Sequence, residues 1–180
     1  MSDVVLETER LQLRRYRLTD LPHYIAMNGD AEVMRYLGGP MAAPDAARQM
    51  ADIADSFERS GFGKIAVERR ADGAFIGFCG LSVEHWYPDD LEIGWRLLPE
   101  YWGQGYATEA ALAWRDFAFE VLVAPRIISI ADVPNVRSHR VMERLGMRLD
   151  HTRDLTDGDE RFRAHIHALT AVEWLELARN

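Results

Sequence analysis

Alternating apolar and polar residues along 10–18, Arg-Leu-Gln-Leu-Arg-Arg-Tyr-Arg-Leu, have a period of two that predicts a β-strand. After Thr19-Asp20, which are suitable helix caps, we expect short helical segments up to Met27 and from Asp30 to Leu37. A longer helix is predicted from Pro44 to Ser60, because apolar residues recur there on one side. They are Ala47, Met50, Ile53, Ala54 and Phe57.

The rest of the chain alternates between strand patterns and helix patterns. We predict strands over 62–69, 74–86, 90–98, 126–132, 147–154 and 161–169, and helices over 107–122, from Pro134-Asn135 to Leu145, and over 171–179. The helix 107–122 carries an apolar face made of Ala110, Trp114, Phe117 and Val121. This order of elements indicates an α/β (α+β) fold with one long mixed sheet.

The charge composition serves mainly to exclude classes of protein. The chain of 180 residues has 20 Arg, a single Lys at position 64, and 29 acidic residues, giving a net charge of -8 that is spread over both halves. Nucleic-acid-binding domains are usually basic, so we expect no nucleic acid as a partner. Hydrophobic residues make up 48% of the chain, and we expect one domain over residues 1–180.

The single cysteine, Cys79, cannot form an internal disulfide. Together with the absence of a recognisable signal peptide, this favours a cytoplasmic protein. No apolar run approaches the roughly 18 residues needed to span a bilayer, so no membrane is expected. The sequence has neither a CxxC nor an HExxH motif, and we propose no metal site from it.

Residues 91–110 show the most informative pattern, which is a strand, a glycine-containing loop and a helix start. A helix N-terminus presents unpaired N–H groups and the positive end of the helix dipole. Gly103 and Gly105, followed by the small Ala107, would let a pyrophosphate approach the backbone closely. Such a site needs no lysine, which matters in a chain that has only one.

Two segments carry a family resemblance that extends over nearly the whole chain. The run from Glu92-Ile93-Gly94-Trp95 through Trp102-Gly103-Gln104-Gly105-Tyr106-Ala107-Thr108-Glu109-Ala110 resembles the acetyl-CoA-binding motif of the GNAT acyltransferase superfamily. It is most similar to the branch that acetylates the N-termini of ribosomal proteins, and the segment Asn135-Val136-Arg137-Ser138-His139-Arg140-Val141 is similar to that branch as well.

The resemblance implies a mixed, mainly antiparallel twisted sheet with helices on both faces, and acetyl-CoA bound in a V-shaped opening between two central strands. It implies that the cofactor-binding residues are Trp95, Leu97, Trp102, Gly103, Gln104, Gly105, Tyr106, Ala107, Thr108, Asn135 and Arg140. Arg137, Arg140 and Arg144 share one helical face. That face either meets a phosphate of CoA or is simply solvated.

Attack of an amine on a thioester requires a base, because free primary amines are largely protonated near pH 7. Glu92 is the candidate base. Alternation places it on the opposite sheet face from Leu91 and Ile93, and the resemblance implies that this strand runs alongside the thioester, where related enzymes often carry an acid. The structural alternative is an ion pair between Glu92 and Arg96. Glu84 and His85 are the other candidate bases.

Asn135 and Ser138 have both a functional and a structural interpretation. Asn135 either binds the pantetheine chain or caps the following helix. Many GNAT enzymes carry a tyrosine acid seven residues after this asparagine, but here the position is Met142, which cannot donate a proton. The resemblance places Ser138 near the thioester sulfur instead, as a hydrogen-bond donor. The alternative is a serine that bonds its own helix backbone.

The implied function is an N-acetyltransferase that acts on a primary amine. A protein N-terminal α-amino group and a small molecule such as a polyamine, amino acid or antibiotic are both open as acceptors, and the acidic chain suits a cationic one. A non-catalytic acyl-CoA-binding or sensor domain is the alternative from another class. The oligomeric state is open, with a homodimer as one option.

Overall fold

The computed structural model describes residues 3–177 and residue 179. The strands are β1 (Val4–Glu7), β2 (Leu11–Arg14), β3 (Lys64–Arg69), β4 (Ala74–Ser82), β5 (Leu91–Leu97), β6 (Arg126–Asp132), β7 (Arg148–Asp157) and β8 (Glu160–Thr170). The helices are α1 (Leu21–Gly29), α2 (Ala43–Ser60), α3 (Tyr106–Glu120), α4 (Val136–Arg144) and α5 (Ala171–Leu177), with short 3₁₀ helices η1 (Leu18–Asp20) and η2 (Pro99–Tyr101). No helix within these described residues is long and apolar enough to cross a membrane.

All the strands form one sheet in the order β1-β2-β3-β4-β5-β6-β8-β7. Neighbouring strands are antiparallel except β5 and β6, which are parallel and pair only at Leu91 with Ile127 and at Glu92 with Ile128. Beyond this short ladder the two strands separate. The Ser129 hydroxyl donates to the carbonyl of Ile93 at 2.8 Å just where the separation begins. The sheet therefore opens at its centre, as the family resemblance implies.

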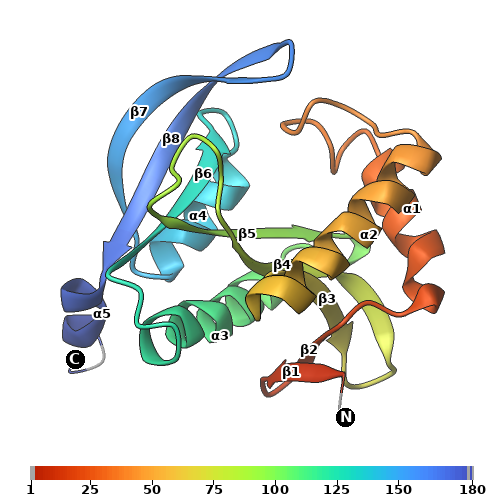
Figure 1. Ribbon diagram of the computed structural model, residues 1–180, viewed down its shortest axis with the longest axis horizontal. Helices are drawn as coiled ribbons and strands as arrows, with labels where there is room; N and C mark the ends of the chain where they lie inside the picture. The colour runs from red at the N-terminus through yellow and green to blue at the C-terminus, as the bar shows by residue number, and fades with distance from the viewer. Residues whose placement is uncertain (1–2, 178, 180) are drawn as a thin grey trace.

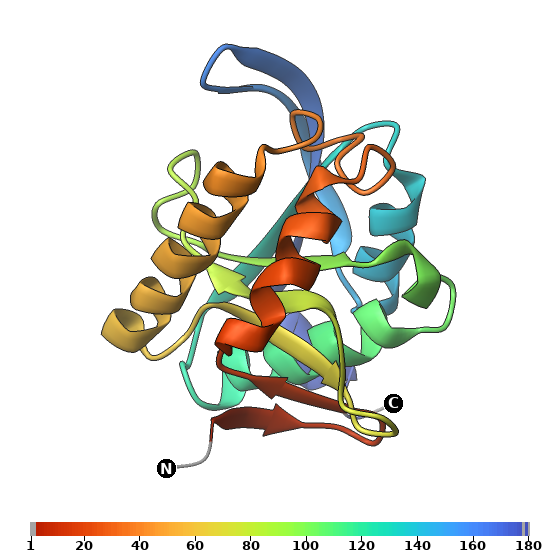
Figure 2. The same ribbon diagram turned by 90° about the vertical axis from the view of Figure 1, so that its right-hand side faces the viewer.

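Helices cover both faces of this sheet, with α1 and α2 on one side and α3 and α4 on the other (Figures 1 and 2). Successive side chains of β3 point to opposite faces of the sheet, which explains why both faces are covered. Ile65 and Val67 pack into the core that contains Trp114 of α3, whereas Ala66 packs with Tyr24 of α1. The predicted fold class, a mainly antiparallel mixed sheet between helices, is confirmed.

Two predictions for the N-terminal region are wrong. The strand predicted over 10–18 ends at Arg14, and a further strand, β1, pairs with its outer edge. The helix predicted from Asp30 to Leu37 is a series of turns. The Asp30 carboxylate accepts from the N–H groups of Glu32 and Val33, which favours a local turn, and Gly38 and Gly39 then adopt φ values of 82°.

Some element ends and one helical face also differ. The strand predicted over 74–86 ends at Ser82, so that Glu84 and His85 lie in the loop that follows. In α3, Ala118 is buried instead of Val121, which is 60% exposed because it lies just beyond the helix end. The predicted C-terminal helix is observed as Ala171–Leu177, and Ala178 of the predicted range 171–179 lies outside the described residues.

Candidate functional site

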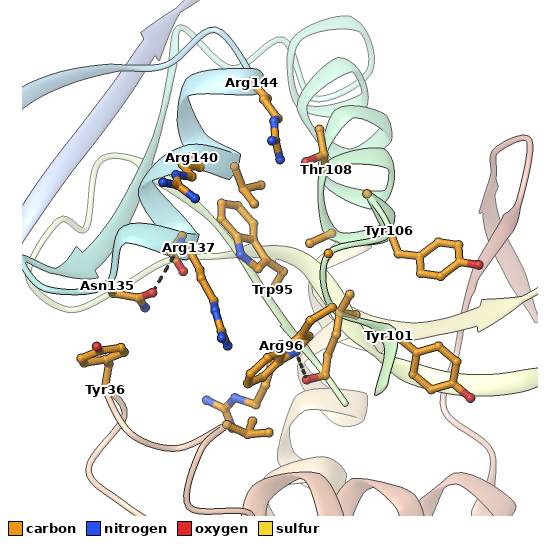
Figure 3. A pocket seen from close by; sticks show the side chains of 18 of the residues that line it. Tyr36, Trp95, Arg96, Tyr101, Tyr106, Thr108, Asn135, Arg137, Arg140 and Arg144 are labelled. Carbon is orange, nitrogen blue, oxygen red and sulfur yellow. Dashed lines mark hydrogen bonds between the residues drawn. The ribbon is translucent and has the colours of Figure 1, made fainter. Parts of the chain in front are cut away.

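A cavity of about 570 Å³ lies between the N-terminus of α3, strand β5 and helix α4 (Figure 3). We call it the first cavity. Its lining includes all but one of the residues that the resemblance implies for the cofactor: Trp95, Leu97, Trp102, Gly103, Gly105, Tyr106, Ala107, Thr108, Asn135 and Arg140. These residues come from three separate segments, which the opening between β5 and β6 brings together.

Gln104 is the exception, because it does not line the first cavity. Its side-chain amide donates to the carbonyl of Glu100 at 2.8 Å, and its own carbonyl accepts from Arg10 at 3.0 Å. The residue therefore shapes the loop between η2 and α3. A direct role of the Gln104 side chain in cofactor binding is not favoured by this geometry.

The start of α3 is built to receive an anion. Gly105 has φ of 84° immediately before the helix, and Gly103 has φ of 72° with no atom within 4 Å of the place where a Cβ would be. L residues rarely adopt such a backbone, which explains both glycines. The first turn of an α-helix leaves its N–H groups without intrahelical partners, and here that turn faces the cavity.

Arginines from α4 form the opposite wall. Arg137, Arg140 and Arg144 all line the first cavity, so their common face is directed at the cavity and is not merely a solvated surface (Figure 3). Arg137 is already engaged, since its guanidinium lies 4.6 Å from the Trp102 ring centre and 3.2 Å from a carboxylate oxygen of Glu32. Among the described residues, Arg140 and Arg144 form no ion pair, which leaves them available for a phosphate.

A second cavity of about 360 Å³ adjoins the first on the side of the loop between α1 and α2 and of the β7–β8 hairpin. Six residues line both cavities: Tyr36, Leu37, Trp95, Arg96, Asn135 and Ser138. The two spaces therefore meet where β5 and β6 separate. A molecule bound in the first cavity would have one end next to the contents of the second.

Glu92 faces the second cavity and has a nearly buried side chain, 8% exposed. The Ser82 hydroxyl lies 3.1 Å from its carboxylate and the Lys64 ammonium also lies 3.1 Å away. The alternative pairing with Arg96 does not occur. Arg96 instead donates to the Asn28 side chain and lies over the Phe78 ring at 5.1 Å.

The two other candidate bases differ in position. Glu84 lines the second cavity, where its carboxylate accepts from Ser82 at 2.7 Å and from Lys64 at 3.3 Å. Burial favours the neutral form of Glu84, but Lys64 and Ser82 outweigh burial and hold the pKa of Glu84 below its usual value. His85 is exposed, stacks beside Trp86 at 4.1 Å and lines neither cavity. The geometry favours the two carboxylates.

Lys64 is the residue that sequence reasoning missed. It lies outside both motifs that carry the family resemblance, yet the sheet places it against Glu92 and Glu84. One signal was present in the sequence. The only lysine of the chain lies near the start of the strand predicted over 62–69, and the two following strands contain glycines. Only the strand register shows that these residues are neighbours.

Asn135 and Ser138 lie at the junction of the cavities. The Asn135 side chain caps α4 by accepting from the Ser138 N–H at 3.3 Å, so the structural interpretation of Asn135 holds, and the residue also lines both cavities. Met142 is buried and lines the second cavity where related enzymes carry a tyrosine. Ser138 lines both cavities, as does Tyr36, so both are hydroxyl-bearing residues at the junction.

His165 and His167 alternate with Ile166 along β8, but neither lines the second cavity. Both rings pack against His139 of α4, with ring centres 5.0 and 5.3 Å away. Burial, followed by the two neighbouring histidines, lowers the pKa of His167 and favours its neutral form. These histidines belong to the packing between α4 and β8.

Comparison with known proteins agrees with this geometry. The family model described as "Acetyltransferase (GNAT) domain" matches residues 10–148. The Bacillus subtilis protein named as the uncharacterized N-acetyltransferase YnaD is 29% identical over 176 residues, which cover 94% of this chain and 98% of that protein. Two solved structures are also similar: an acetyltransferase from Agrobacterium tumefaciens, at 30% identity with a TM-score of 0.80, and a GNAT-family acetyltransferase from Bacillus anthracis, at 25% identity with a TM-score of 0.81. They align with 94% and 93% of this chain, and with 95% and 98% of their own.

The chain therefore belongs to the GNAT acetyltransferase family. It is an enzyme of the class that takes an acetyl group from acetyl-CoA and transfers it to an amine. The residues present fit acetyl-CoA, because the first cavity combines a helix N-terminus with two uncommitted arginines and leads to the carboxylates of the second.

Proposed function

We propose that this chain transfers the acetyl group of acetyl-CoA directly to a cationic primary amine, and that residues 1–180 form one domain for this reaction. The observation that carries the proposal is the junction of the two cavities where β5 and β6 separate. The first cavity has donors for a pyrophosphate, and the second has carboxylates for an ammonium. Acetyl-CoA supplies the activated acetyl group when it is bound.

Glu92 is the proposed general base. A primary amine arrives mostly as its ammonium form near pH 7, and an ionised carboxylate at hydrogen-bond distance can first hold that ammonium and then accept its proton. The support for this role is that the Glu92 side chain is nearly buried and faces the second cavity, which is the proposed acceptor site. Glu84 lies beside it and is the alternative base.

Ser138 is the proposed hydrogen-bond donor for the departing thiolate. Its backbone N–H is bound to Asn135, while its side chain lines both cavities. Ser138→Ala is expected to slow the release of free thiol with little change in the dissociation constant for acetyl-CoA. Stopped-flow measurement of thiol release would check this. A wild-type rate in the variant would indicate that Ser138 only stabilises the start of α4.

The acceptor is proposed to be cationic because five carboxylates line the second cavity, whereas Lys64 and Arg96 are its cations. The acids are Glu84, Glu92, Asp132, Asp157 and Glu160. A protein N-terminal α-amino group is the first candidate, in line with the resemblance to the ribosomal-protein branch. A small cationic amine is the second candidate. It is favoured by the β7–β8 hairpin, whose Glu160 would lie 2.9 Å from a Cβ placed on Gly38 and which thereby narrows the entrance.

A panel of acceptors separates these candidates. Free CoA thiol is followed with peptides that have free N-termini, with the same peptides carrying blocked N-termini, and with polyamines and single amino acids. Turnover restricted to free peptide N-termini supports the first candidate, and turnover with small amines alone supports the second. Absence of turnover with every amine would contradict the proposed function. Light scattering in the same buffer tests whether the chain forms a homodimer, which is one of the open options.

A further inference from the structure

Lys64 lies between the two carboxylates of the second cavity. Its Nζ atom is 3.1 Å from Glu92 and 3.3 Å from Glu84. The Lys64 side chain is 22% exposed and that of Glu92 is 8% exposed, so their contact is largely removed from water. An ion pair in such surroundings is screened much less than one at the surface.

The sheet leaves room for the Lys64 side chain to extend from β3 across β4 towards β5. Lys64 pairs with Gly80 of β4, and Gly80 pairs with Gly94 of β5, so that the three residues share one sheet face. Neither glycine places a side chain on that face. A Cβ on Gly94 would lie 3.1 Å both from Cε of Lys64 and from Oε2 of Glu92. The aliphatic chain of Lys64 thus crosses β4 over the two glycines to reach Glu92.

Lys64 is also the donor that can bond both carboxylates at once. The Ser82 hydroxyl lies 2.7 Å from Glu84 and 3.1 Å from Glu92, but it carries one hydrogen and can satisfy only one of them at a time. The ammonium has three hydrogens. Without it, two carboxylates would share a half-buried site, where like charges favour protonation of one.

We propose that Lys64 is a positioning residue for acetyl transfer: it fixes the orientation of the Glu92 carboxylate and offsets one of the two negative charges at the place where the acceptor is proposed to enter. The inference rests on the proposed function of the same site. The two carboxylates and one ammonium leave a single negative charge, which suits one acceptor ammonium. The proton of that ammonium then passes to Glu92, which becomes a carboxylic acid while the amine becomes neutral.

The charge state of Lys64 is consistent with this role. Burial disfavours its ammonium, but Glu92 and Glu84 outweigh burial and hold the pKa of Lys64 above its usual value. Burial also raises the pKa of Tyr24 on α1 to about 12 and raises that of the Cys79 thiol. These two groups are therefore neutral in an assay. The remaining ionisable groups facing the cluster are Arg96 beside it, His85 next to Glu84, and Tyr36, Asp132, Asp157 and Glu160 around the cavity.

Kinetics of two variants test the role of Lys64. Lys64→Met removes the charge at similar length, and Lys64→Arg keeps it. For Lys64→Met we expect kcat to fall by about a hundredfold, the loss typical of a misplaced reacting group. We also expect the acidic limb of the kcat/KM profile to move up by about one pH unit, because the carboxylates lose the cation that favours their ionised form. Lys64→Arg should recover part of kcat and should return the acidic limb of the kcat/KM profile to its wild-type pH. In both variants the dissociation constant for acetyl-CoA should stay within about twofold of wild type.

A second measurement does not depend on turnover. Because Lys64 is the only lysine, labelling lysine with ¹⁵N at Nζ in an untagged chain gives one side-chain ammonium signal that needs no assignment. We expect this signal to titrate above the ordinary lysine range in the wild type and at lower pH in Glu92→Gln. A signal that titrates identically in both proteins would overturn the contact.

The two proposals fail in different ways. A wild type that acetylates none of the amines rejects the proposed function, whatever the lysine signal does. A wild type that does acetylate an amine, together with a Lys64→Met variant that keeps its kcat and its pH profile, rejects the role of Lys64 alone.

Discussion

Arg14 is among the largest side chains that the protein buries, with 2% of its surface exposed. Two of its nitrogens donate to Asp20 at 2.7 and 2.8 Å, and its Nε donates to Glu68 at 2.7 Å. The guanidinium thereby connects β2, η1 and β3. A fork of donors matched to two carboxylates is the arrangement in which a buried arginine is tolerated.

Removing Arg14 should be costly because it takes the ion-pair partner from the buried carboxylate of Asp20 and leaves Glu68 paired with Arg17 alone. We expect Arg14→Met to lower the free energy of unfolding by about 3–5 kcal/mol. The matched control is Arg15→Met, since Arg15 pairs with Glu58 at the surface and is 43% exposed. That change should cost about 1 kcal/mol or less. Urea denaturation of both variants checks the contrast, and equal losses would contradict it.

Glu92 is the single residue whose chemistry matters most to the proposed reaction. Glu92→Gln keeps the size of the side chain but removes the base, so kcat should fall by about 10²–10⁴-fold. The dissociation constant for acetyl-CoA should hardly change, because Glu92 lines only the second cavity. Glu143→Gln, on the exposed side of α4, is the control for loss of one negative charge. An unchanged kcat in Glu92→Gln would indicate that Glu84 is the base instead.

Among the elements, α3 owes its position to a clamp at its first turn. The Glu109 carboxylate accepts from the Thr8 hydroxyl at 2.6 Å, from the Arg10 backbone N–H at 2.9 Å and from the Arg10 guanidinium at 2.6 Å. The turn between β1 and β2 is therefore tied to the helix start. Arg10 also lies 4.5 Å from the Tyr106 ring centre, and in Figure 3 that ring points away from the cavity, so Tyr106 is not directed at a ligand through its ring.

The glycine before α3 tests the first cavity as the cofactor site. Gly105→Val forces a β-branched residue into a left-handed backbone and should distort the N–H groups of the first turn. We expect the dissociation constant for acetyl-CoA to rise by about a hundredfold, equivalent to about 2.7 kcal/mol. Calorimetric titration gives this value directly.

Gly73→Val is the matched control for that variant. Gly73 has a φ of 71° in the turn between β3 and β4, with open space around it, and it lies outside both cavities. The backbone strain should therefore be similar, whereas acetyl-CoA binding should persist. Loss of binding in both variants would indicate that strain alone is responsible.

At the scale of the whole molecule, the many acids make stability depend on pH. Burial raises the pKa of Glu109, but its bonds to Thr8 and Arg10 outweigh this and lower its pKa below the ordinary value of 4.5. Glu84 behaves in the same way beside Lys64. Carboxyls with a depressed folded-state pKa contribute stability above their unfolded pKa and lose it as the pH falls through the folded value.

The melting temperature should accordingly fall as the pH drops below about 4.5. Glu109→Gln should melt at a lower temperature than wild type at pH 7, and the melting temperatures of the two proteins should converge in acid.

Asp132→Asn should show the opposite dependence of melting temperature on pH. Burial and Glu160 raise the pKa of Asp132, so its ionisation is unfavourable and the variant should melt higher at pH 7 but like wild type in acid. Calorimetry across this pH range checks both, and parallel curves for Glu109→Gln would contradict the assignment.

The sequence by itself determined most of the elements and the family. Period-two and helical patterns predicted most of the strands and helices, because sheet faces and helix faces must be apolar where they pack. The loop around Gly103 and Gly105 was recognisable because a positive φ admits few residues besides glycine. Local sequence patterns predicted the wrong element where side-chain hydrogen bonds fix the backbone conformation, as those of Arg14 and Asp30 do.

Only the tertiary structure decided how the site is composed. Lys64 lies 28 positions before Glu92 in the sequence, and nothing local connects them until β3, β4 and β5 pair in register. Of the two neighbours Glu84 and His85, the fold brings only Glu84 to the second cavity. His165 and His167 pack against His139 of α4 and do not line that cavity. The reason is that a contact between distant segments depends on strand register and helix packing, which the whole chain sets together and no single segment encodes.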